Sequence, residues 1–386
     1  MQQLIQRTRL IEKIETGLRE FPVTVLLGAR QTGKTTLSRM IAGKRDHVTV
    51  FDLESPASRA GLSRTPELTL SDCKGLVIID EVQRMPELFA LLRPLCDSPG
   101  RKASFLLLGS ASPDLVKGVS ESLAGRACFI QVSGFAIDEV GAENQDRLWL
   151  HGSFPKAYTS NKEGAWRWLD SFSQTFLERD LPLLGVRIPA ETLRRFWIML
   201  SHYHGQIWNS AEIGQAMSVS SKTVLHYRDI LSGSYMLRVL PPWFENIGKR
   251  QIKSHKVYLR DSGLLHSFMG IETMQGLRSH PKYGASWEGF AMEQVISIHG
   301  DRDIYFWGTQ RGAELDLLIM RHGKRLGFEF KCRDAPSTTK SMHIAVEDLG
   351  LEHLWVIYPG KESYRLDKRI TALPLSQLSK TTLREK

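Results

Sequence analysis

Short apolar runs of strand length alternate with helical segments over the first third of the chain. These runs occupy residues 23–28, 47–54, 75–81, 103–110 and 127–132. They are mostly apolar throughout, which is typical of parallel strands covered on both faces. Strands that alternate with helices predict a parallel α/β domain, which we place in residues 1–150. A ligand of such a domain binds at the carboxyl ends of the strands.

The rest of the chain does not continue this alternation of strands and helices. Two helical patterns around residues 210–232 are separated by a short serine-containing turn, and Ser221 is the expected N-cap of the second helix. Residues 284–300 predict an amphipathic helix, and residues 311–331 predict a β-hairpin. The sequence therefore predicts a helical and winged-helix domain in residues 151–262 and a further α/β domain in residues 263–386.

The charge of the chain is unevenly distributed. The net charge is +9 over 386 residues; residues 1–150 hold 19 basic and 18 acidic side chains, and residues 151–386 hold 32 and 24. A basic back half favours a polyanionic partner there, although basic proteins are common and charge alone decides little. No apolar run reaches the roughly 18 residues of a membrane span, and the N-terminus has no signal-peptide pattern.

Four widely spaced cysteines without a C-x-x-C pair favour free thiols in a reducing compartment: Cys73, Cys96, Cys128 and Cys332. We therefore expect a cytoplasmic protein without a membrane partner.

The first motif lies directly after the first predicted strand. Residues 28–35, GARQTGKT, match G-x-x-x-x-G-K-[ST] without a gap. Such a loop points backbone N–H groups and a helix N-terminus at phosphate oxygens. The lysine then reaches the β and γ phosphates and the threonine hydroxyl ligates Mg²⁺. The predicted nucleotide-binding residues are Gly28, Ala29, Arg30, Gln31, Thr32, Gly33, Lys34, Thr35, Thr36 and Ser110.

Two acidic residues complete this candidate site for ATP and Mg²⁺. The apolar strand GLVIIDE ends in Asp80, which would hold the metal together with Thr35, and Glu81, which would polarise the attacking water. Ser110 ends the next strand, where a residue that contacts the γ-phosphate or orients water is needed; a simple turn explains it almost as well. Together with Lys34, these acids are the candidate catalytic residues.

Arg126 is a candidate arginine finger. It follows Gly125 at a helix-to-strand corner, and an outward guanidinium there would reach the ATP of a neighbouring subunit. A basic residue that simply stabilises a helix C-terminus is an equally good interpretation.

The motifs together resemble a known family. GARQTGKTT, VIIDEVQRMPEL, LLLGSAS and ESLAGR are similar to the AAA-type ATPase domain of a large group of prokaryotic proteins that carry a C-terminal domain long described as of unknown function. The resemblance continues through HGSFPKAY, FLERDLPLL, GASWEGFAMEQ and VIYPG, and so covers nearly the entire chain. It implies a P-loop NTPase of the AAA+ type in the first domain.

The middle of the chain holds the candidate DNA contacts. A recognition helix presents its N-terminal residues to the major groove, which selects Lys222 and Thr223. Residues 246–260 then hold five basic side chains and no acid, and we expect four of them to grip phosphates: Lys249, Arg250, Lys253 and Lys256. Helix-turn-helix folds also serve as protein–protein modules, so both interpretations stand.

The hairpin near the C-terminus carries a candidate nuclease site. Side chains alternate along a strand, so Glu314 and Asp316 share one face, and Glu329 and Lys331 share a face of the next strand. Asp316, Glu329 and Lys331 resemble the Asp, Asp/Glu-x-Lys motif of the restriction-endonuclease-like fold, and Glu288 would complete its metal shell. A half-exposed antiparallel sheet also produces charged alternation. The fold is expected, while cleavage is left open because a fold does not carry its function along.

These features favour a homo-oligomeric, ATP-driven DNA motor, such as a hexameric ring, that moves or remodels duplex or branched DNA. An ATPase domain that leads into a winged helix also resembles the plan of Holliday-junction motors. The alternatives are an ATP-gated, Mg²⁺-dependent nuclease or defence switch, and a regulatory scaffold that does not cleave DNA.

Overall fold

The chain divides into two structural units. The structure, a computed structural model, describes residues 4–110, 118–119, 121–245, 248 and 250–378. The first unit contains Met1–Gly134 and the short segment Gly233–Tyr235, and the second contains Phe135–Ser232 and Met236–Lys386. No helix within the described ranges is long and apolar enough to cross a membrane.

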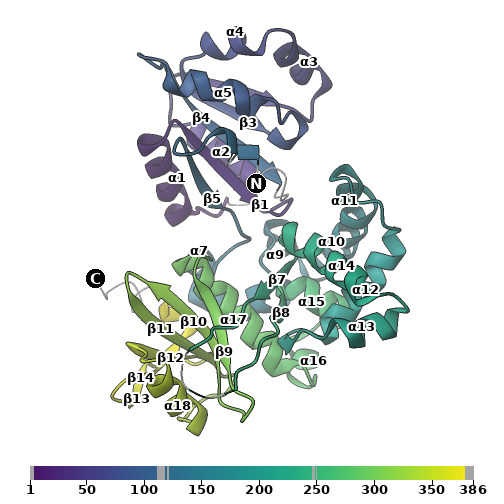
Figure 1. Cartoon of the computed structure of the whole chain (residues 1–386), viewed down its shortest axis with the longest axis vertical. Coiled ribbons are helices and arrows are strands. Elements are labelled where there is room, and N and C mark those ends of the chain that lie inside the picture. Colours follow the sequence, from purple (N-terminus) through teal and green to yellow (C-terminus); the bar gives the residue numbers. More distant parts are fainter. Residues whose placement is uncertain (1–3, 111–117, 120, 246–247, 249, 379–386) are drawn as a thin grey trace. The chain divides into compact units, whose positions relative to one another are not determined.

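A five-stranded parallel sheet forms the centre of the first unit (Figure 1). Its order is β2-β3-β4-β1-β5. The strands are β1 (Val23–Gly28), β2 (Val48–Asp52), β3 (Gly75–Asp80), β4 (Ala103–Ser110) and β5 (Ala127–Gln131). The predicted parallel α/β fold is confirmed, and the strand bounds differ from the predicted ones by at most two residues at either end.

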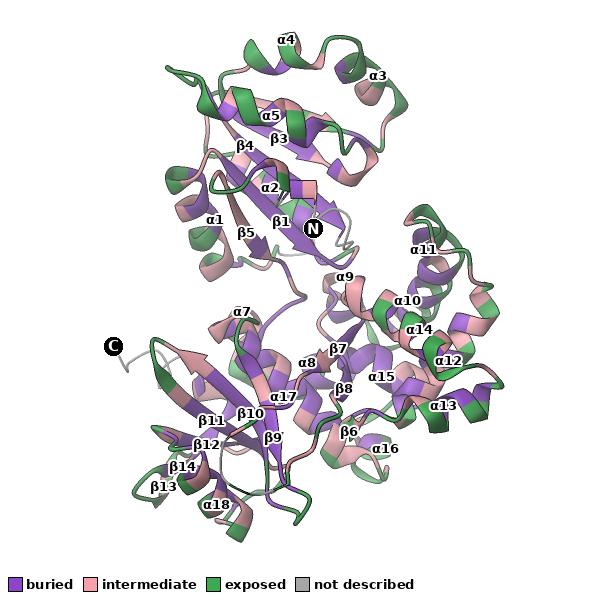
Figure 2. Cartoon of the chain, viewed as in Figure 1, coloured by how far each residue is buried: buried purple, intermediate pink, exposed green. Residues whose placement is uncertain are grey.

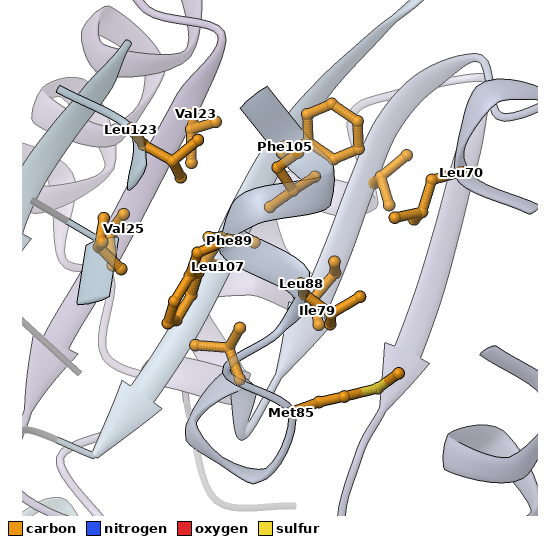
Figure 3. Close-up of a cluster of buried hydrophobic side chains, with 14 of the residues drawn as sticks. Val23, Val25, Leu70, Ile79, Met85, Leu88, Phe89, Phe105, Leu107 and Leu123 are labelled. Carbon is orange, nitrogen blue, oxygen red and sulfur yellow. The ribbon is translucent and has the colours of Figure 1, made fainter. Parts of the chain in front are cut away.

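Helices cover both faces of this sheet because successive side chains of each strand point to opposite faces. Leu26, Ile78 and Leu106 pack with Ile14 and Leu37 in one cluster. The alternate positions of β1, β3 and β4 pack with helical residues in a second cluster, part of which Figure 3 shows: Val23, Val25, Leu70, Ile79, Met85, Leu88, Phe89, Phe105, Leu107 and Leu123. The central strands β1, β3 and β4 are mostly buried, the edge strands β2 and β5 are only partly buried, and the helices keep an exposed outer side (Figure 2).

The first unit also contains helices, of which α1 precedes β1 and the others lie between consecutive strands. They are α1 (Thr8–Glu20), α2 (Lys34–Ala42), α3 (Pro56–Arg64), α4 (Pro66–Ser71), the 3₁₀ turn η1 (Val82–Arg84) and α5 (Leu88–Asp97).

The second unit begins with a helical region. Its helices are α7 (Ile137–Val140), α8 (Gln145–His151), α9 (Pro155–Thr159), α10 (Lys162–Thr175), α11 (Leu181–Leu183), α12 (Ala190–His202), α13 (Ser210–Met217), α14 (Ser221–Gly233), α15 (Ser262–Phe268) and α16 (Met274–Arg278). A π-helical turn, Phe176–Asp180, joins α10 to α11.

The expected helix-turn-helix is formed by α13 and α14. Ser218, in the left-handed region with φ of 58°, ends α13. Ser220 caps α14, because its Oγ accepts from the backbone N–H of Thr223 at 3.1 Å. The expected cap, Ser221, is instead the first residue of the helix. A three-stranded antiparallel sheet of order β6-β8-β7 accompanies the helix pair: β6 (Gln206–Ile207), β7 (Leu237–Leu240) and β8 (Lys256–Leu259).

A six-stranded mixed sheet forms the C-terminal part of the second unit. Its order is β13-β14-β12-β11-β10-β9. The strands are β9 (Ile304–Gly308), β10 (Glu314–Arg321), β11 (Lys324–Phe330), β12 (His353–Tyr358), β13 (Tyr364–Asp367) and β14 (Ile370–Pro374), with helices α17 (Tyr283–His299) and α18 (Lys340–Asp348). The predicted helix and hairpin are therefore present, the hairpin as antiparallel β10 and β11.

Two stretches between β7 and β8, residues 241–243 and 250–252, lie beside the edge strand β9. The backbone N–H of Trp243 donates to the Phe306 carbonyl at 2.7 Å, and that of Ile252 donates to the Gly308 carbonyl at 2.9 Å. These bonds satisfy part of an edge that would otherwise present unpaired backbone groups. They also join the helical region to the mixed sheet within one unit.

Helix α8 belongs to this unit although we expected residues up to 150 in the first domain. His266 on α15 donates from Nδ1 to the Leu150 carbonyl at 3.0 Å, and its Nε2 lies 2.7 Å from Ser286 Oγ on α17. The Trp149 indole N–H donates to the same hydroxyl at 2.8 Å. Burial lowers the pKa of His266 to about 4, so the ring is neutral near pH 7 and can accept from Ser286.

The close approach of α15 to α8 gives a stability prediction. A Cβ at Gly263 would lie 2.2 Å from the His151 carbonyl oxygen. Gly263→Ala should therefore destabilise the protein by about 1–3 kcal/mol or more through overpacking against backbone. Gly284→Ala is the control, because Gly284 is an exposed helical residue and a Cβ there meets nothing within 4 Å. It should stabilise by up to about 1 kcal/mol. Urea unfolding followed by tryptophan fluorescence compares the two, and equal midpoints would contradict the packing argument.

Candidate functional site

The predicted phosphate loop connects β1 to α2. Gly28 ends β1 and pairs with Ser110 of β4, and Gly33 precedes α2 with φ of 93°. This left-handed conformation is one that glycine adopts without strain. Thr32 closes the loop internally, because its hydroxyl donates to the Ala29 carbonyl at 2.9 Å. Thr35 and Thr36 lie exposed in the first turn of the helix.

Lys34 folds back onto the loop that carries it. Its Nζ donates to the carbonyls of Gly28 at 3.0 Å and Ala29 at 2.7 Å. Burial lowers the pKa of Lys34 to about 8, against the opposing effect of Glu81 and Asp80. Its hydrogen-bond partners are neutral carbonyls, so phosphate oxygens would be stronger partners for the same ammonium.

Thr35 and Asp80 meet as the sequence predicts. The Thr35 hydroxyl donates to Asp80 Oδ2 at 2.7 Å, and Asp80 Oδ1 accepts from the Glu81 backbone at 2.9 Å. β1, β4 and β3 are parallel neighbours in the sheet, so Thr35 after β1 and Asp80 at the end of β3 lie at the same carboxyl edge. A hydroxyl and a carboxylate are oxygen ligands that suit Mg²⁺. This donor pair fits the expected metal.

Glu81 is held by two side chains. It has φ of 55° directly after β3. Arg30 of the loop lies 3.7 Å from its carboxylate, and the Gln83 amide donates to it. The same Gln83 nitrogen lies 2.7 Å from the hydroxyl of Ser110. The predicted residues Arg30, Glu81 and Ser110 are therefore joined, through a glutamine that no sequence pattern singled out.

Arg7 is a second residue that the sequence did not reveal. It is 5% exposed and precedes α1. Its guanidinium donates to the carbonyls of Thr32 at 3.1 Å, Ser133 at 3.1 Å and Gly134 at 2.8 Å. It thus connects the phosphate loop to the segment that follows β5. Its partners are backbone atoms far along the chain, so no local motif marks it.

Arg126 lies at the amino end of β5, whereas the loop lies at the carboxyl end of β1. It directly precedes β5, and its guanidinium donates to Asp97 Oδ1 at 2.6 Å and Oδ2 at 2.7 Å. Because β1 and β5 are parallel, Arg126 and the loop of the same subunit are separated by the length of a strand, at about 3.3 Å per residue. A role in ATP hydrolysis requires a neighbouring subunit.

The candidate DNA contacts divide into exposed and buried residues. Lys222 is exposed and Thr223 half-buried at the start of α14, and Arg250 and Lys253 are exposed. Lys249 lies outside the described residues. Lys256 differs from the expectation: it is 5% exposed and cannot grip phosphates on the surface, because its side chain points into a set of carboxylates.

These carboxylates include those of the candidate nuclease site. Lys256 Nζ lies 3.7 Å from Glu288, 3.8 Å from Glu314 and 3.6 Å from Asp316. Glu329 pairs with Lys331 at 2.7 Å. We name the set the acid–lysine cluster: Lys256, Glu288, Glu314, Asp316, Glu329 and Lys331.

Hydrogen bonds and burial determine the ionisation of the cluster. Tyr258 donates to Glu288 at 2.6 Å, and the Phe330 backbone donates to Asp316 at 3.0 Å. Burial and the charge of Asp316 raise the pKa of Glu288 to about 7 and that of Glu329 to about 8. Burial opposes the charge on Lys256, but Glu288, Asp316 and Glu314 outweigh it, so the pKa of Lys256 is raised.

The cluster does not fit the divalent metal that a restriction-endonuclease-like fold implies. An ammonium already lies between three of its carboxylates, and both Asp316 oxygens have partners. Within the described ranges, no group of three or more His, Cys, Asp or Glu side chains is arranged to hold a metal ion. The predicted acids Glu288 and Asp316 lie close together in the structure, but no sequence pattern placed Lys256 between them.

Comparison with protein families divides the chain into three. Residues 20–141 match an AAA domain, residues 142–275 match a domain of unknown function (DUF8612) and residues 283–378 match a domain of unknown function (DUF4143).

One similar solved structure is the Walker-type ATPase PABY2304 of Pyrococcus abyssi, which is 18% identical in sequence. The match covers 69% of this chain and 96% of that chain, with a TM-score of 0.49. Another is RuvB, the Holliday junction branch migration motor of Thermotoga maritima, at 15% identity, 61% and 90% coverage and a TM-score of 0.30.

Two curated mycobacterial proteins are similar along almost the whole chain. "Uncharacterized protein Rv2008c" of Mycobacterium tuberculosis and "Uncharacterized protein Mb2031c" of Mycobacterium bovis are each 46% identical over 380 residues, which is 98% of this chain and 86% of theirs. This chain belongs to their family, and in it an N-terminal AAA domain is joined to a C-terminal DUF4143 domain.

Proposed function

We propose that the protein is an ATP-hydrolysing AAA+ motor that binds DNA and remodels or translocates duplex or branched DNA, as in branch migration. The observation that carries the proposal is the assembled loop site, where Lys34, Thr35, Asp80 and Glu81 meet at the carboxyl ends of β1 and β3. The AAA family match supports nucleotide binding by the same residues.

Each residue of the site has a distinct role in this proposal. Lys34 exchanges its two loop carbonyls for phosphate oxygens, and the backbone N–H groups of the loop bind the remaining oxygens. Thr35 and Asp80 hold Mg²⁺, which neutralises charge on the phosphates when it is bound. Glu81 orients the attacking water once Arg30 and Gln83 release it.

The DNA part of the proposal rests on the second unit. A helix-turn-helix followed by an antiparallel sheet of order β6-β8-β7 supports a winged-helix module. Lys222 at the start of α14, with Arg250 and Lys253 in the segment that leads to β8, supplies exposed positive charge. The net charge of +8 over residues 151–386, 32 basic minus 24 acidic, agrees in sign with a polyanionic partner.

Loss of Lys34 tests the nucleotide site. Lys34→Ala removes the ammonium that grips phosphate, a loss of about 2–3 kcal/mol or more, which is a roughly 30- to 150-fold weaker affinity for ATP. Lys44→Ala is the control, because Lys44 is exposed just beyond α2. Titration with a fluorescent ATP analogue, together with phosphate release, provides the measurement. Near wild-type turnover in Lys34→Ala would show that the loop is misinterpreted.

A mixing experiment tests Arg126 and the homo-oligomer together. Arg126→Ala should bind ATP normally but lose roughly 10³–10⁵ in kcat if it acts as a finger on a neighbour. Asp97→Asn, which removes its partner, should keep hydrolysis. Co-expression of Arg126→Ala with Lys34→Ala should recover hydrolysis, since one variant supplies the intact loop and the other the guanidinium. Wild-type hydrolysis by Arg126→Ala, or an inactive co-expressed mixture, would refute the finger.

DNA-stimulated hydrolysis tests the motor. We expect ATP turnover to rise with duplex or four-way DNA more than with single strands. Lys222→Ala/Lys253→Ala should reduce the slope of log affinity against log salt by about 1.8, about 0.9 for each phosphate that the protein no longer neutralises. Lys340→Ala/Lys361→Ala removes two exposed charges elsewhere in the unit and should leave the slope unchanged. ATP turnover that is unchanged by every DNA tested would contradict the motor.

A further inference from the structure

We propose that Lys256 is the resident cation of the acid–lysine cluster: it occupies the place that a divalent metal takes in restriction-endonuclease-like sites, and it fastens β8 to the six-stranded sheet. This inference does not depend on the proposed motor, because it concerns side chains of the second unit alone.

The position of Lys256 is set by its strand. It is the first residue of β8, which lies between the other two strands of its sheet, and it pairs with Ile207 on one side and Leu240 on the other. Pairing on both sides fixes the backbone from which the side chain extends. Its Nζ lies 5.7 Å from the centre of the Phe306 ring of β9. The ammonium therefore has the apolar ring of Phe306 near it as well as the carboxylates.

The carboxylates come from two other elements. Glu288 projects from α17, and Glu314 and Asp316 project from β10. The pairing of β10 with β9 shifts in register between Leu315 and Leu318, and a bulge of this kind re-aims side chains. One ammonium thus contacts acids on a helix and on a strand at 3.6 to 3.8 Å.

Neither partner is stable in this site without the other. A buried ammonium without carboxylates is strongly unfavourable, and so are buried carboxylates without a cation. Mg²⁺ binds oxygen ligands at about 2.0–2.1 Å, so an ion shared by Glu288 and Asp316 would lie against the positive charge of Lys256. The ammonium and the metal therefore compete for the same oxygens.

The same ion pairs join two parts of the second unit. β8 belongs to the sheet beside the helix-turn-helix, while β10 and α17 belong to the C-terminal part. The segment that leads into β8 is already hydrogen-bonded to β9. The cluster adds a buried, charge-specific contact to this junction, so its acids serve to hold the parts together.

Manganese binding to the full-length, nucleotide-free protein tests the proposal. We expect electron paramagnetic resonance to detect the same Mn²⁺ binding in the wild type and in Asp316→Asn, because no ion binds at the cluster of the wild type. Lys256→Met should lower the melting temperature of this unit by roughly 5–15 °C and create Mn²⁺ binding that restores part of the loss. Lys361→Met is the control, because Lys361 is an exposed lysine of the same unit outside the cluster, and it should change neither quantity.

Two results would overturn the proposal without any Lys256 variant. One is Mn²⁺ binding by the wild type that is lost in Asp316→Asn. The other is plasmid cleavage by the wild type that needs Mn²⁺ and is lost in Glu329→Gln. If Lys256→Met fails to fold, Lys256→Met/Asp316→Asn removes one charge of each sign and should fold. A double variant as defective as Lys256→Met would also contradict the ion pairing.

Discussion

A buried ammonium must be surrounded by oxygen atoms, and the chain meets this requirement in opposite ways at two lysines. Lys34 is surrounded by neutral carbonyls, and burial lowers its pKa to about 8. Lys256 is surrounded by three carboxylates, and its pKa is raised. The ammonium of Lys34 is hydrogen-bonded only to neutral groups among these partners, so a phosphate can still pair with its charge. Lys256 has its counter-charges within the protein, which explains why similar burial leads to two different assignments.

The loop site depends on the parallel direction of the strands. Because β1, β3 and β4 are parallel, the loop after β1 and the acids after β3 lie at the same edge of the sheet, where the carboxyl ends of the strands are. Arg126 lies at the other edge, where it pairs with Asp97. The proposed phosphate-binding residues therefore lie together within one subunit, whereas the proposed finger would act on a neighbouring subunit.

Nucleotide and DNA are proposed to bind to different units. The contacts within the second unit determine how the proposed DNA-binding part is supported. The helix-turn-helix does not stand alone, because the segment before β8 is bonded to β9 and Lys256 is paired with acids of α17 and β10. A force applied to α14 would thus be carried into the C-terminal sheet. In this view the C-terminal mixed sheet stiffens the proposed DNA-binding region.

The sequence by itself determined the strands of the parallel sheet, the phosphate loop with Asp80 and Glu81, the helix-turn-helix and the C-terminal hairpin. Each is encoded locally: an apolar run, a glycine spacing or an alternation is visible within a few neighbouring residues.

Only the tertiary structure decided the roles of Arg7, Gln83 and Lys256. Their partners include a carbonyl 127 residues away for Arg7, a hydroxyl 27 residues away for Gln83, and carboxylates on other elements for Lys256. In the sequence Lys256 is one more basic residue in a basic segment. Its burial follows from long-range packing, and no local pattern encodes which charges that packing brings together.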